Sequence, residues 1–79
     1  MTQFDELLKK SRDYVIIRLK RMAAQEIRDL RSHELAAITG QAELLQANGL
    51  FSVREADDLI VHAREVFAGK AEPSTDGNW

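Results

Sequence analysis

The sequence predicts an all-α fold, a single domain of three helices, from three observations. The stretch from Gln3 to Ala68 is rich in Ala, Leu, Glu, Arg and Gln, which favour helix, and the first proline is Pro73. Apolar and polar residues never alternate in the manner of a strand over more than a few positions. Gly49 divides the helical stretch, and Gly69 ends it. We expect helices over residues 3 to 31, 33 to 48 and 52 to 68.

The first predicted helix is long and amphipathic. At about 100° per residue, its apolar side chains fall on one broad face. That face comprises Phe4, Leu7, Leu8, Val15, Leu19, Met22 and Leu30. The opposite arc is basic and comprises Lys9, Lys10, Lys20, Arg21, Arg28 and Arg31. Arg18 is an exception on the apolar side, so it either pairs with Asp29, Glu26 or an acidic group of another chain, or extends its head to water from the edge of the face.

The second helix is expected to begin after a kink or break near residues 31 to 33. Its apolar residues follow helical spacing, but in one continuous helix they would point away from the first apolar face. These residues are Leu35, Ile38, Ala42 and Leu45. Ser32 is the predicted N-cap of this helix.

The boundary between the second and third helices has the most specific signals. Gly49 supplies the left-handed residue that ends a helix, and Leu50 stands where a Schellman motif places an apolar contact with Leu45. Ser52 and Glu55 have the spacing of a capping box at the start of the third helix. The last two helices are therefore predicted to form an antiparallel hairpin.

The third helix is predicted to end at Gly69, and Pro73 blocks its continuation. We divide the chain into one helical domain, residues 1 to 69, and a polar tail, residues 70 to 79. Two interpretations of the terminal Trp79 remain open. It is either part of a disordered end, which is the usual behaviour of termini, or an anchor in an interface.

The amount of apolar helix surface predicts self-association. A chain of 79 residues without cysteine buries a smaller fraction of its surface than a larger domain, and ordering it costs about 1.5 kcal/mol per residue. Two short helices cannot cover the whole apolar arc of the first one. We therefore expect a homodimeric bundle, or a target protein against the first helix.

The sequence contains no arrangement typical of catalysis. His62 lies one turn after Asp58 and two turns after Arg54, which is the spacing of a ladder of surface charges. His33 is the other histidine, and the four glycines are isolated and form no phosphate-binding loop. We expect no enzyme activity, no catalytic residue, no metal, no cofactor and no small-molecule substrate.

Nucleic-acid binding is the alternative function. Residues 9 to 31 carry eight basic and three acidic side chains, a net charge of +5, whereas residues 32 to 79 carry three basic and eight acidic ones, a net charge of −5. The basic arc could contact phosphates through Lys10, Lys20, Arg21, Arg28 and Arg31. Against this, the third helix begins with acidic residues that DNA would repel, and the pI is about 5.6.

The favoured interpretation is a protein-interaction module, a small adaptor, regulator or inhibitor that covers a surface of another protein. An amphipathic helix can place its apolar face in a groove of a partner. The predicted contacts are Phe4, Leu8, Val15, Arg18, Leu19, Arg21 and Met22. No apolar run approaches the roughly 20 residues that a membrane helix needs, and no secretory signal is visible, so we expect no membrane partner and a cytoplasmic location.

Overall fold

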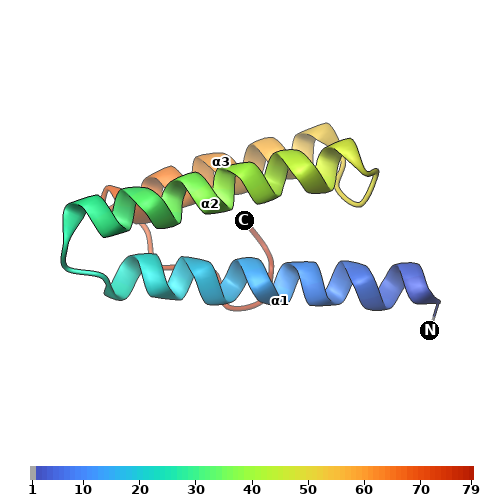
Figure 1. The fold of residues 1–79 in the computed structure, drawn as a ribbon, viewed down its shortest axis with the longest axis horizontal. Helices are drawn as coiled ribbons and strands as arrows, with labels where there is room; N and C mark the ends of the chain where they lie inside the picture. The colour runs from blue at the N-terminus through green and yellow to red at the C-terminus, as the bar shows by residue number, and fades with distance from the viewer. Residues whose placement is uncertain (1) are drawn as a thin grey trace.

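The computed structural model describes residues 2 to 79 and contains three helices with no strand among those residues. These helices are α1 (Gln3–Ala24), α2 (Arg28–Ala47) and α3 (Val53–Phe67). In Figure 1, α2 and α3 lie above α1, and the final segment of the chain crosses α1 near its middle. The molecule is elongated, measuring 39 × 20 × 18 Å along its principal axes. The prediction of an all-α fold with three helices is confirmed.

A complete capping box begins α1. The Thr2 hydroxyl accepts a hydrogen bond from the Asp5 backbone N–H at 3.2 Å, and the Asp5 carboxylate accepts one from the Thr2 N–H at 3.4 Å. Asp5 and Glu6 also place negative charge in the first turn, where it interacts favourably with the helix dipole. The N-terminus of α1 is therefore fixed by its own sequence.

The predicted break near residues 31 to 33 is wrong, because the chain leaves helical geometry at Gln25 and α2 begins at Arg28. Ser32 lies inside α2 and does not act as an N-cap, and no side chain caps this helix at Ile27. Within the connection, the Ile27 N–H donates to the Gln25 side-chain oxygen at 3.2 Å. With the break at this position, the apolar residues of α2 share one core with Val15, Leu19 and Met22 of α1.

The turn between α2 and α3 contains the predicted Schellman motif. Gly49 has a φ of 74°, and the backbone N–H of Leu50 donates to the Leu45 carbonyl at 2.9 Å. The Ser52 hydroxyl caps α3 by accepting the Glu55 N–H at 3.0 Å. The reciprocal half of the predicted capping box is absent, because the Glu55 carboxylate pairs with Arg12 of α1 instead.

The same motif ends α3 at Gly69, where the sequence predicts the end of the helix. Gly69 has a φ of 74°, and the Lys70 N–H donates to the Glu65 carbonyl at 2.8 Å. The two helix ends marked by glycine are therefore specified by local hydrogen bonds that only a left-handed residue permits without strain.

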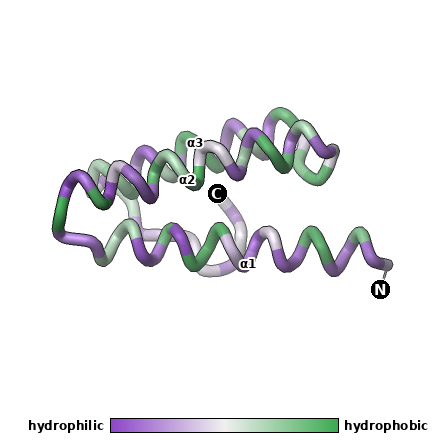
Figure 2. Tube along the Cα trace, viewed as in Figure 1, coloured by the Kyte–Doolittle hydropathy of each residue, from purple (hydrophilic) through white to green (hydrophobic). Residues whose placement is uncertain are grey.

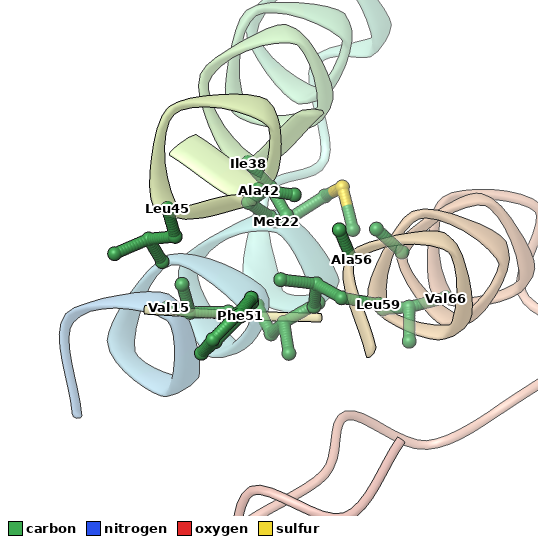
Figure 3. Close-up of a cluster of buried hydrophobic side chains, with 11 residues drawn as sticks. Val15, Met22, Ile38, Ala42, Leu45, Phe51, Ala56, Leu59 and Val66 are labelled. Carbon is green, nitrogen blue, oxygen red and sulfur yellow. The ribbon is translucent and has the colours of Figure 1, made fainter. Parts of the chain in front are cut away.

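The hydrophobic core lies between the three helices. Figure 3 shows side chains from all three converging, together with Phe51 from the turn. The buried apolar residues are Val15, Leu19, Met22, Ile38, Ala42, Leu45, Phe51, Ala56, Leu59, Ala63 and Val66. The helices α2 and α3 pack most extensively, and α1 packs more closely on α2 than on α3. One side of the α1/α2 pair is consequently not covered by α3.

Candidate interaction surfaces

Three of the predicted partner contacts lie in the core of the single chain. Val15, Leu19 and Met22 are fully buried. Phe4 is 52% exposed, and Leu8 is partly buried against the core. The apolar face that the sequence assigns to a partner is therefore mostly covered by the chain's own α2 and α3, and only its N-terminal part remains accessible.

A groove runs between the N-terminal half of α1 and the C-terminal half of α2. It has a volume of about 440 Å³, and none of its lining residues is charged. The lining comprises Phe4, Leu7, Leu44, Leu45 and Leu50 with the neutral polar residues Ser11, Gln41 and Asn48. The large side chains at its rim are accessible, since Leu7 is 51% and Leu44 56% exposed. We call the groove, together with the exposed Tyr14 one turn after Ser11 on α1, the open face.

The first two turns of α1 contain no fully buried residue, so the apolar side chains there remain partly exposed. Buried residues of α1 begin only at Ser11, whose hydroxyl donates to the Leu7 carbonyl at 2.8 Å. Figure 2 shows apolar residues continuing along α1 to its N-terminal end, which extends beyond the turn that joins α2 to α3. Apolar surface gathered in this way is typical of an interaction site.

Arg18 is held at the other end of the open face. Its guanidinium pairs with the Glu34 carboxylate at 3.0 Å and donates through Nε to the Tyr14 hydroxyl at 2.9 Å. The hydrogen bond to Glu34, followed by that to Tyr14, raises the pKa of Arg18 above its ordinary value. The predicted partners Asp29 and Glu26 are wrong, because α2 runs back along α1 and brings Glu34 opposite Arg18.

The predicted basic arc is divided between two helices. The break before Arg28 leaves Lys9, Lys10, Lys20 and Arg21 exposed on α1 and puts Arg28 and Arg31 on α2. Arg31 donates to the Phe67 carbonyl and lies over the Phe67 ring at 5.0 Å, so its charge serves an internal contact. The nucleic-acid alternative stays a prediction.

The end of the chain packs back on the helices. Residues 71 to 79, which we call the return segment, include Ala71 and Trp79 against the core and the buried Gly77. The Trp79 ring lies 6.1 Å from the Phe51 ring, centroid to centroid, at an angle of 48°. Trp79 thus packs on the chain's own core, which is neither the disordered end nor the interface anchor that the sequence left open. The division of the chain at residue 69 stays a prediction.

Arg12 joins the return segment to α1 and α3. Its guanidinium pairs with Glu55, donates to the Gly77 carbonyl at 3.2 Å, and lies 5.1 Å from the Phe51 ring and 5.6 Å from the Trp79 ring. Charge-assisted hydrogen bonds and cation–π contacts are both stronger when partly shielded from water. Sequence reasoning did not identify Arg12, Phe51 or Glu55 as members of one cluster.

Asp76 organises the turn before Trp79. Its carboxylate accepts the Asn78 backbone N–H at 3.0 Å and the Ser74 hydroxyl at 3.1 Å, and these bonds, the Asn78 one first, lower the pKa of Asp76. A lowered pKa stabilises the folded turn above the ordinary Asp pKa of about 3.9, and this contribution is lost as the pH falls through the folded value.

Acidification is therefore expected to loosen the return segment before the helices melt. The emission of Trp79, the only tryptophan, should move to longer wavelength below about pH 4 while helical circular dichroism is retained. The variant Asp76→Ala should show the shifted emission already at neutral pH. If emission and helicity change together in both proteins, Asp76 does not organise this turn.

The histidines have ordinary surroundings. His62 Nε2 accepts the Ser74 backbone N–H at 3.0 Å, and His33 is exposed. Among residues 2 to 79, no group of three or more His, Cys, Asp or Glu side chains is placed to hold a metal ion. No helix in the same range is both long and apolar enough to cross a bilayer.

Comparison with known proteins identifies no relative. No family model, curated protein or solved structure matches the chain. Two surfaces therefore bear on its function. One is the open face, and the other is the surface of α1 and α3 on which the return segment packs.

Proposed function

We propose that the chain is a non-enzymatic protein-interaction module, a small adaptor, regulator or inhibitor, that binds its partner through the open face. The observation that supports this proposal is the uncharged groove whose rim exposes Phe4, Leu7 and Leu44. Full burial of each such side chain contributes about 1.5 to 3 kcal/mol. Because each is already about half buried, a partner gains part of that amount from each of the three.

A helix with an apolar stripe fits the groove best. Two neighbouring helices form an elongated channel between them, and a third helix fills it with residues spaced three and four apart. The Arg18–Glu34 pair marks one end of the channel and is internally satisfied, so it requires no opposite charge from the partner. The partner contacts proposed now are Phe4, Leu7, Tyr14, Leu44 and Leu50.

A second copy of the chain is the first partner to test. Exposed helix pairs commonly associate face to face around a twofold axis and form four-helix bundles. In such a dimer, the antiparallel hairpin of α2 and α3 would support α1, and the open faces of both copies would be covered together. The fully buried Val15, Leu19 and Met22 would remain in each copy's own core.

Charged substitutions on the open face are expected to abolish association. We predict that the double variant Leu7→Glu, Leu44→Glu shifts the chain from dimer to monomer by light scattering over a concentration series, because each carboxylate would have to be desolvated in the interface. The matched control is Ile17→Glu with Val61→Glu, since these side chains are 52% and 53% exposed but lie elsewhere. The control should keep the mass of the original chain.

Two results would contradict this proposal. If the original chain remains monomeric at every concentration, a second copy is not the partner. If the control variant loses association while the open-face variant keeps it, the interface lies on another surface. Circular dichroism of both variants confirms that helicity is retained before the masses are compared.

A further inference from the structure

The return segment covers a surface formed by α1, α3 and the turn before α3, which we call the α1/α3 groove and which shares no lining residue with the open face. Two of its bonds to the helices involve only the peptide backbone of that segment. The Ser74 N–H donates to His62 Nε2 at 3.0 Å, and the Gly77 carbonyl accepts from Arg12 at 3.2 Å. Contacts of this kind do not depend on which side chains the bound segment carries.

Trp79 makes the side-chain contact that depends on the amino-acid sequence of the bound segment. Its ring packs on Phe51, which is only 3% exposed, and lies beside the Arg12 guanidinium. Arg12 is oriented in turn by Glu55 of α3. A bound segment can therefore pack an aromatic ring on Phe51 and next to the Arg12 guanidinium. Arg12 also donates to the backbone carbonyl two residues before that ring.

The return segment does not satisfy every polar group that it buries. Trp79 Nε1 is buried and has no hydrogen-bond partner. Leaving a buried donor unpaired is unfavourable. An open space of about 420 Å³ remains beside the indole, lined by polar residues that include Arg54, Asp58 and Asn78. A different peptide can therefore gain contacts that the return segment lacks.

We propose that the α1/α3 groove is a binding site for an extended segment of another protein, and that the return segment is its built-in competitor. The ligand chemistry is a backbone carbonyl two residues before an aromatic side chain, with the aromatic ring placed between Phe51 and Arg12. A tethered competitor acts at an effective concentration of the order of millimolar, so the chain binds such a ligand weakly until the return segment is released.

The test uses a fluorescent peptide with the sequence of residues 70 to 79 and blocked ends, measured by anisotropy against the full-length chain. The variant Trp79→Ala removes the competitor's anchor, and it should bind the peptide at least ten times more tightly than the original chain does. A second variant, Gly77→Val, releases the segment differently, because a β-branched residue does not adopt the φ of 82° found there. It should also gain binding.

Matched controls assign the binding to the groove. In the Trp79→Ala background, adding Arg12→Gln should abolish binding, whereas adding Arg21→Gln, an exposed arginine of the same helix, should leave it unchanged. Adding Leu44→Glu should also leave it unchanged, which separates this site from the open face. The proposal is overturned if both released variants keep their helicity and fail to bind the peptide, or if a peptide with alanine in place of Trp79 binds equally well.

Discussion

The substitution Leu19→Ala is expected to lower the free energy of unfolding by about 2 to 5 kcal/mol, which is the usual cost of emptying a fully buried leucine site. Leu19 has no exposed surface and lies in the core between the helices. For a domain of this size, each kcal/mol lowers the melting temperature by about 4 to 8 °C. Denaturant unfolding followed by circular dichroism measures the loss.

Ile17→Ala is the control for this prediction. Ile17 lies two residues earlier on α1 and is 52% exposed, so its truncation should change stability by about 0.5 kcal/mol or less. Equal losses in the two variants would show that α1 does not bury the Leu19 side as described. If Leu19→Ala lowers the free energy of unfolding only when a partner is bound, Leu19 is a partner contact, as the sequence predicts.

Phe51→Ala is expected to cost about 3 to 5 kcal/mol and to change the surroundings of Trp79 as well. Phe51 is the core residue contributed by the turn, and its ring contacts both Arg12 and Trp79. Its removal leaves a cavity and takes away the surface on which the indole packs. Unfolding curves should shift strongly, and the native-state emission of Trp79 should move to longer wavelength.

Two comparisons separate these effects. Phe51→Leu keeps most of the apolar volume and should recover much of the stability, but not the aromatic contact with Trp79. Val61→Ala, at an exposed position of α3, should leave both measurements nearly unchanged. If Phe51→Ala alters stability without altering the Trp79 emission, the return segment does not depend on this ring.

Local signals predicted the helix ends that local hydrogen bonds determine. The Gly49 and Gly69 ends follow from left-handed glycines and nearby carbonyls, and the sequence contains all of that information. The connection from Gln25 to Ile27 contains no comparable signal. Its position depends on contacts between α1 and α2, so the cap signal at Ser32 was misleading and the predicted first helix was seven residues too long at its C-terminus.

Periodicity identified which side of α1 is apolar, but it could not say what covers that side. Val15, Leu19 and Met22 occupy the same face as Phe4, yet only Phe4 among them remains exposed. The cluster of Arg12, Glu55 and Trp79 could not be predicted, because its members come from three distant parts of the chain. The one related hypothesis was that Trp79 anchors an interface.

The missing side-chain cap of α2 distinguishes the first connection between helices from the second. Each glycine-ended helix terminus closes with two backbone bonds, whereas the first amides of α2 have no side-chain acceptor. We therefore expect partial opening to begin at the connection of residues 25 to 27, with α1 moving away while α2 and α3 stay paired. A folding pathway that runs in reverse would assemble α2 with α3 first and dock α1 last.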